Sequence, residues 1–143
     1  MKLKSKALHR SNAPAAVILI RLIVGAVFLS EGVQKFLFPG QLGAGRFTKI
    51  GIPVPEILGP LVGGAEIVCG VLVLLGWLTR LAVIPLIVIM LTAIGSTKIP
   101  ILLDGGFWAM AHEASTDYSM LLGSIFLLIA GAGPWSVDAR LRR

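Results

Sequence analysis

Residues that carry chemistry are scarce in this sequence. Its 143 residues include one cysteine and two histidines, and only 14% of them are charged. The single cysteine, Cys69, cannot form an internal disulfide, a CxxC redox pair or a four-thiolate metal site, so we interpret it as a small buried hydrophobe. His9 lies in a basic N-terminal stretch and leaves only His112 near the apolar segments, which excludes a haem held by two histidines. The sequence also contains no Walker loop and no nucleophile elbow.

Hydrophobic residues are abundant in their place. They make up 56% of the sequence, and the mean hydropathy is +0.90. In a soluble domain, by contrast, about a quarter of the residues are charged. Long apolar runs at this composition predict an integral membrane protein. The length allows one compact bundle of membrane helices and little else.

Four apolar segments are long enough to cross a hydrocarbon core of about 30 Å at about 1.5 Å per residue. The predicted spans cover about residues 15–38, 56–77, 79–97 and 116–132, with Pro100 closing the third. The short turn at residues 76–80 makes the second and third spans antiparallel neighbours. The predicted fold is therefore all-α. We expect a polytopic membrane protein whose antiparallel bundle of four transmembrane helices occupies residues 15–135, between basic tails at 1–14 and 136–143.

The net charge of +6 first suggests nucleic acid, but the cations are placed as topology signals. The chain ends and the turn between the second and third spans carry eight of them: Lys2, Lys4, Lys6, Arg10, Arg80, Arg140, Arg142 and Arg143. The other two loops carry three: Arg46, Lys49 and Lys98. The positive-inside rule therefore predicts that both termini are cytoplasmic, and no nucleic-acid partner is expected. We interpret the N-terminal segment as an uncleaved first span rather than a signal peptide.

Ionisable residues inside the predicted spans are the strongest functional signal. At about 100° per residue, Arg21, Glu31 and Lys35 share one face of the first span, and Glu66 lies near the midplane of the second. A charge at the centre of the bilayer costs at least about 2.5 kcal/mol, so these side chains are expected to face inward as one buried polar site. Arg21 and Glu66 are expected to lie within reach of each other. The site would bind a proton or a ligand; the alternative is an ion-pair network that fixes helix register.

Small residues recur on the same helices and predict close packing. Gly59 and Gly63 form a GxxxG motif, at which two helices approach closely and which also offers a contact for a homo-oligomer. The expected helix-packing positions are Gly25, Gly32, Gly59, Gly63, Gly70 and Gly123.

A second polar group is expected outside the membrane. It consists of His112, Glu113 and Asp117, one histidine and two carboxylates that offer donors for a metal ion. Their spacing is not a specific metal signature of the HExxH kind, so no metal site is predicted. We interpret the group as the solvated start of a helix capped by Ser115 or Thr116.

Several longer segments resemble the DoxX family. They are RLIVGAVFLSEGVQKFLFP (Arg21–Pro39), GIP (Gly51–Pro53), EIVCGVLVLLGWLTRLA (Glu66–Ala82) and GAGPWSVDARL (Gly131–Leu141). The resemblance implies a small four-helix protein of the bacterial inner membrane. The family takes its name from a subunit associated with a quinol oxidase and thiosulfate:quinone oxidoreduction, and some members look like partners of thiol-redox and superoxide-detoxifying proteins. The lone Cys69 argues against the cysteine-pair chemistry of a related branch.

Three functions remain open from the sequence. The resemblance favours a membrane subunit or partner of a quinone-linked or oxidative-stress redox system, in which Arg21, Glu31, Lys35 or Glu66 bonds the oxygens of an isoprenoid quinone or passes protons. The chain has no electron carrier of its own, so we do not expect it to be an enzyme by itself. The alternatives are a small protein that translocates protons or a solute, and a membrane scaffold without chemistry of its own.

Overall fold

The computed structural model describes residues 14–143. The expectations that concern Lys2, Lys4, Lys6, His9 and Arg10 lie outside the described residues. The described part of the chain is helical and contains no strand. Its elements are α2 (Val17–Leu37), α3 (Ala44–Lys49), α4 (Pro55–Leu75), α5 (Thr79–Ala93), the π-helical turn η1 (Ile94–Lys98), α6 (Ile99–Glu113), α7 (Ser115–Ala130) and α8 (Val137–Arg140).

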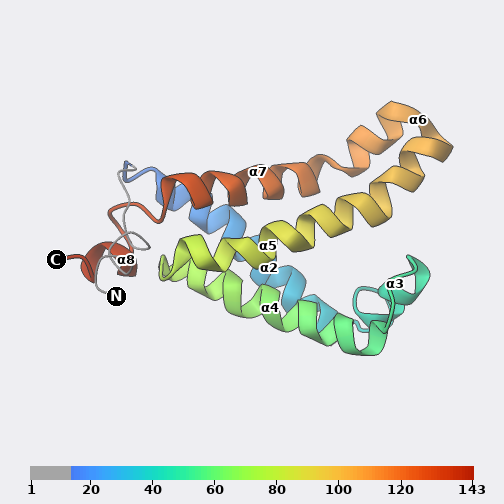
Figure 1. Cartoon of the computed structure of the whole chain (residues 1–143), viewed down its shortest axis with the longest axis horizontal. Helices are drawn as coiled ribbons and strands as arrows, with labels where there is room; N and C mark the ends of the chain where they lie inside the picture. Colours follow the sequence, from blue (N-terminus) through green and yellow to red (C-terminus); the bar gives the residue numbers. More distant parts are fainter. Residues whose placement is uncertain (1–13) are drawn as a thin grey trace.

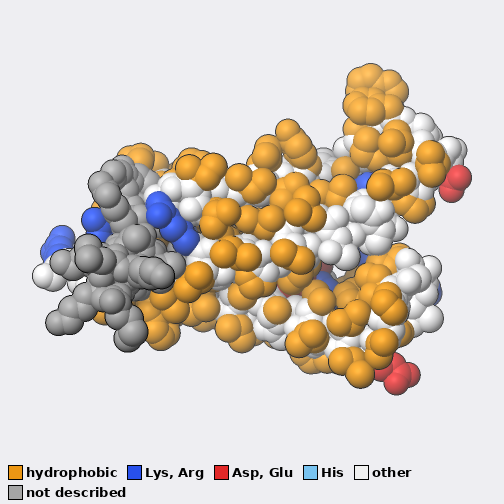
Figure 2. Space-filling model, in the orientation of Figure 1, with side chains coloured by type: hydrophobic (Ala, Val, Ile, Leu, Met, Phe, Trp, Pro, Cys, Tyr) orange, Lys and Arg blue, Asp and Glu red, His pale blue; other side chains and the backbone are white. Residues whose placement is uncertain are grey.

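Three helical stretches are long and apolar enough to cross a membrane. They are Val17–Leu37, Pro55–Leu75 and the combined stretch Thr79–Glu113, and the shorter Ser115–Ala130 is also apolar. α2, α4, α5 and α7 run along the long axis of the molecule, and apolar side chains cover most of the visible surface (Figures 1 and 2). A surface of this kind suits lipid rather than water, which agrees with an integral membrane protein.

The third helix differs from the prediction. The sequence predicts that it ends near residue 97, with Pro100 closing it. The structure instead continues α5 through η1 into α6. Pro100 is accepted because it is the second residue of α6, directly after a π-helical turn that shifts the hydrogen-bond register. The break occurs at Gly106, whose φ of 80° and ψ of 179° suit glycine alone.

Glycines bring α2 and α4 into close antiparallel contact. A Cβ on Gly25 would lie 2.9 Å from the carbonyl oxygen of Gly70, and a Cβ on Gly32 would lie 2.7 Å from that of Gly63. As the residue number rises on α2, its partner's number falls on α4, which fixes the antiparallel register. The two backbones are therefore as close as small residues allow.

We expect Gly70→Ala to destabilise the protein by about 1–3 kcal/mol, because the new methyl group would overlap the backbone of the neighbouring helix. A Cβ at Gly70 would lie 2.8 Å from the amide nitrogen of Leu29. Gly64→Ala is the matched control, since it makes the same change on the same helix where nothing lies within 4 Å. It is expected to be neutral or to stabilise by up to about 1 kcal/mol. Unfolding of both variants in detergent tests this, and equal effects would contradict the proposed packing.

The other glycines pack within the chain as well. A Cβ on Gly59 would lie 2.8 Å from the amide nitrogen of Ala44, at the start of α3. A Cβ on Gly123 would lie 2.7 Å from Cγ2 of Val24, where α7 meets α2. Both positions of the Gly59–Gly63 motif are thus occupied by α3 and α2 of the same chain, so this face is not free for a second copy.

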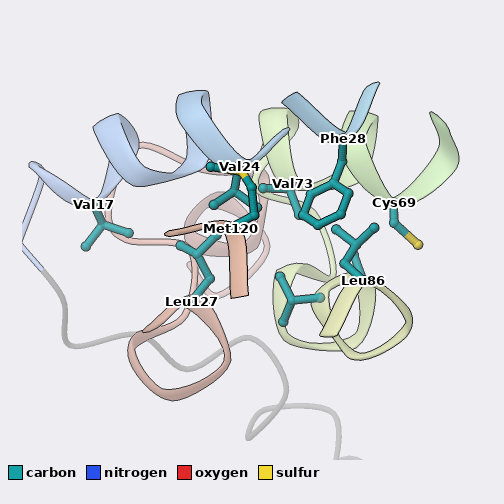
Figure 3. Close-up of a cluster of buried hydrophobic side chains, with 10 residues drawn as sticks. Val17, Val24, Phe28, Cys69, Val73, Leu86, Met120 and Leu127 are labelled. Carbon is teal, nitrogen blue, oxygen red and sulfur yellow. The ribbon is translucent and has the colours of Figure 1, made fainter. Parts of the chain in front are cut away.

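The hydrophobic core fills one half of the bundle. Val24, Phe28, Val73, Leu86 and Leu127 are at most 1% exposed and converge from α2, α4, α5 and α7 (Figure 3). Cys69 belongs to the same cluster and is 8% exposed. The core residues of these two helices come mainly from the first half of α2 and the second half of α4. The second half of α2 and the first half of α4 therefore lie largely outside the core.

Candidate functional site

A cavity of about 520 Å³ occupies the half of the bundle that the core leaves open. α2, α4, α5 with η1, α7 and the segment around α3 all contribute to its wall. At this end the molecule divides into two lobes, one carrying α6 and the other α3 (Figures 1 and 2). Most of the wall is apolar, and its apolar residues include Phe28, Phe47, Ile52, Leu58, Val62 and Met90.

An ion pair lies inside this apolar wall. Lys35 of α2 places its Nζ 2.7 Å from Oε2 of Glu66 on α4, and the Glu66 side chain is only 2% exposed. The same Nζ lies 3.9 Å from Oε2 of Glu31, whose side chain is half exposed. Glu31 and Lys35 are one helical turn apart, so a single face of α2 supplies both. Three of the four predicted site residues therefore meet at one cavity.

Glu66 is buried and can still accept a hydrogen bond. Its Oε2 lies 2.7 Å from Nζ of Lys35, and within residues 14–143 no other donor reaches that oxygen. An ionised carboxylate has about four acceptor positions on its two oxygens, and one ammonium occupies only part of them. The Glu66 carboxylate can therefore accept a hydrogen bond from a bound molecule.

Arg21 does not belong to this site, which corrects the expectation that it reaches Glu66. Its guanidinium is buried at the other end of α2 and is not among the residues that line the cavity. It donates four hydrogen bonds to main-chain carbonyls: Nε to Val73 at 3.0 Å, Nη2 to Leu74 at 2.6 Å, and Nη1 to Trp135 at 2.6 Å and Ala132 at 3.2 Å. The last carbonyls of a helix lack their usual amide partners, and at the end of α4 Arg21 serves those of Val73 and Leu74, with the amide of Gly76 also donating to Val73 at 3.1 Å.

The C-terminal segment completes a structural junction around Arg21. Oδ1 of Asp138 accepts a hydrogen bond from the amide of Leu78 at 2.9 Å, and Oδ2 accepts one from Thr79 at 3.2 Å. These contacts cap the first amides of α5. Gly76 stands in the left-handed region with φ of 68°, where a Cβ would lie 2.5 Å from that of Ser136. Position 76 thus requires glycine both for its backbone and for the space it leaves.

The expected outer cluster does not form as a group. His112 and Glu113 are exposed near the end of α6, whereas Asp117 faces the cavity and pairs with Lys98 at 3.1 Å. In the described residues, no three metal-ligating side chains gather. Sequence reasoning also missed the polar cavity residues Arg46, Thr92, Ser96 and Thr97. The π-helical turn that positions two of these residues left no signal in the hydropathy pattern.

Comparison with known proteins identifies the family. The DoxX family model matches residues 16–99. The chain belongs to the DoxX family. The uncharacterized membrane protein Rv3486 of Mycobacterium tuberculosis is 56% identical over 142 residues, which cover 95% of this chain and 87% of that protein. The Bacillus subtilis protein named "Putative oxidoreductase CatD" is 30% identical over 121 residues, which cover 85% of this chain and 83% of that protein. No solved structure matches the chain.

The DoxX match and the cavity overlap only in part. The matched segment runs from the start of α2 to the start of α6, and it contains Arg21, Glu31, Lys35 and Glu66. α7 and the capping residue Asp138 lie beyond it. The ion pair and most of the cavity wall are thus within the DoxX segment, while α7 closes the remaining side.

Proposed function

We propose that this DoxX-family protein binds an isoprenoid quinone in the cavity and acts as a membrane partner of a redox system. The observation that carries the proposal is the Lys35–Glu66 ion pair inside an otherwise apolar cavity. A quinone has the matching build, with polar ring oxygens at one end and a hydrocarbon chain at the other. The ring would lie against the ion pair, and the chain would lie along the apolar wall.

Size and placement support this proposal. A volume of about 520 Å³ lies within the range of about 300–1,000 Å³ that is usual for small-molecule sites. Charged groups at membrane depth are rare and usually face a binding site or a partner charge. Glu66 is the twelfth residue of α4, about 17 Å from the start of the helix, so its backbone would lie near the middle of a bilayer of about 30 Å, and Lys35 reaches it from the last turn of α2.

We also propose that α7 is a fourth span and that both termini are cytoplasmic. α7 has 16 residues, about 24 Å of helix, and it packs beside the long third helix. Arg80 donates to the carbonyl of Ile129 near the end of α7, and α8 with Arg140 and the C-terminus lies at the same end of the molecule (Figure 1), as the positive-inside rule requires of the cytoplasmic side. A green fluorescent reporter fused after Arg143 is expected to fluoresce, whereas export of that end would leave it dark.

The redox assignment comes from the relatives. A Bacillus subtilis relative carries a name that assigns it to the oxidoreductases, and the family resemblance points to quinone chemistry. This chain offers no electron carrier among its own side chains, so we propose that a bound quinone exchanges electrons with a partner protein.

Binding of menaquinone-4 tests the proposal. We expect the detergent-purified protein to carry quinone detectable by mass spectrometry and to bind menaquinone-4 in a calorimetric titration. Lys35→Gln is expected to weaken binding about tenfold, because the ring oxygens then lose their charged hydrogen-bond donor. Lys49→Gln is the matched control, since it makes the same change on an exposed residue outside the cavity wall and should leave affinity unaltered.

Absence of both carried and titrated quinone would contradict the proposal. Proton flux into proteoliposomes that disappears in Glu31→Gln, in a protein without quinone, would instead support a translocating protein.

A further inference from the structure

The polar groups of the cavity are mainly hydrogen-bond acceptors. Three hydroxyls on its α5–η1 wall each give their single proton to a main-chain carbonyl one turn back. Thr92 donates to Val88 at 2.9 Å, Ser96 donates to Thr92 at 2.7 Å, and Thr97 donates to Ala93 at 2.6 Å. A hydroxyl has only one proton, so each of these oxygens is left able only to accept.

The charged groups add further acceptors. Glu66 presents a buried carboxylate with spare acceptor positions beside Lys35, and Glu31 and Asp117 present carboxylates from α2 and α7. Of the cations that line the cavity, Lys35 is held between Glu66 and Glu31, and Arg46 is exposed at the α3 edge. A bound head group that offers a proton therefore finds partners here, whereas one that offers only carbonyl oxygens competes with two carboxylates for Lys35.

We infer that the site selects a ligand whose head group carries a hydroxyl, and that Glu66 accepts the proton of that hydroxyl. This inference rests on the proposed function and adds to it: of a quinone couple, the reduced quinol binds more tightly than the quinone. Only a hydrogen bond forms, and no covalent bond or proton transfer is involved. Tighter binding of the reduced form raises the reduction potential of the bound couple, by about 30 mV for each tenfold preference.

The test uses two probes that differ in one proton donor, 1-naphthol and 1-methoxynaphthalene. Neither needs a redox reaction, so oxygen does not disturb the titration. With the full-length protein in detergent, we expect 1-naphthol to bind at least about tenfold more tightly, after subtraction of binding to empty micelles. In Glu66→Gln the ratio is expected to fall toward one, because the amide can also donate to the ether oxygen.

Glu56→Gln is the matched control. It makes the same carboxylate-to-amide change on the same helix, at an exposed residue outside the cavity wall, and should keep the wild-type ratio. If the wild-type protein binds the two probes with equal affinity, the inference is wrong, and this result needs no variant. An unchanged ratio in folded Glu66→Gln would overturn the role of Glu66.

The two proposals fail separately. If menaquinone-4 binds but 1-naphthol has no advantage, the hydroxyl preference is wrong and the quinone site stands. If 1-naphthol is preferred but menaquinone-4 does not bind, the preference for a hydroxyl head group stands and the quinone assignment is wrong.

Discussion

Replacement of Arg21 by methionine is expected to abolish stable tertiary packing in mild detergent. The change removes the guanidinium from four main-chain carbonyls, and those of Leu74, Ala132 and Trp135 lose the partner that Arg21 gives them, while that of Val73 keeps the amide of Gly76 at 3.1 Å. A buried acceptor without a partner costs about 1–3 kcal/mol, so the sum over three carbonyls is a large part of the stability of a small domain, about 5–15 kcal/mol. We expect a loss of at least about 4 kcal/mol, which raises the open population about a thousandfold.

The single cysteine provides the readout for this prediction. Cys69 is buried in the core, so its rate of modification by a maleimide reports how often the helices separate. Arg21→Lys keeps the charge but replaces a planar fork by a compact ammonium, and it should recover less than half of the stability. Arg46→Met is the control, since this arginine is exposed and should leave the rate unchanged. A wild-type rate in Arg21→Met would show that the junction does not hold the bundle together.

Lys35→Met is expected to have the second largest effect. It leaves the Glu66 carboxylate buried without its cation, and breaking a buried pair in this way costs about 3–5 kcal/mol. Glu66→Met should be milder, because Lys35 keeps the half-exposed Glu31 at 3.9 Å. In the double variant no buried charge is left alone, so it should be more stable than Lys35→Met.

A double-mutant cycle on detergent-solubilised protein measures the coupling between the two charges. Unfolding by sodium dodecyl sulfate, followed by circular dichroism, gives the stability of the wild type, the two single variants and the double variant. If the two single effects add to within about 0.5 kcal/mol, the ion pair does not exist as described.

The helical fold was predictable because its cause is local. The hydropathy of a span is an average over about twenty neighbouring residues, so it can be read from the sequence alone. The predicted spans at 15–38 and 56–77 coincide with α2 and α4 to within two residues at each end. The angular positions of Gly25, Gly32, Glu31 and Lys35 on one face also follow from 3.6 residues per turn. Such patterns need no knowledge of the partner helix.

The placement of Arg21 could not be predicted in the same way. A helical stripe gives the angle of a side chain but not the residue that lies opposite on the next helix. The structure pairs Gly25 with Gly70, so the antiparallel register puts Arg21 opposite Leu74 and leaves Glu66 nearer to Leu29. Two charges that seemed close in depth are therefore separated along the bundle.

The extension of the third helix escaped prediction for a related reason. The rule that proline ends a helix is statistical, and the π-helical turn before Pro100 removes the clash on which that rule depends. The same turn carries Lys98 to Asp117, which takes this carboxylate away from His112 and Glu113. Adjacency in sequence was thus a poor guide to which polar groups share a site.

The most direct test is to locate the bound quinone itself. An azido derivative of 2-methyl-1,4-naphthoquinone, activated by light in proteoliposomes, should label peptides that contain residues 27–35, 58–66 and 88–97. An excess of menaquinone-4 should prevent this labelling. Labelling confined to lipid-facing side chains such as Leu19, Leu61 and Ile129, or unaffected by the competitor, would contradict a quinone site at the Lys35–Glu66 pair.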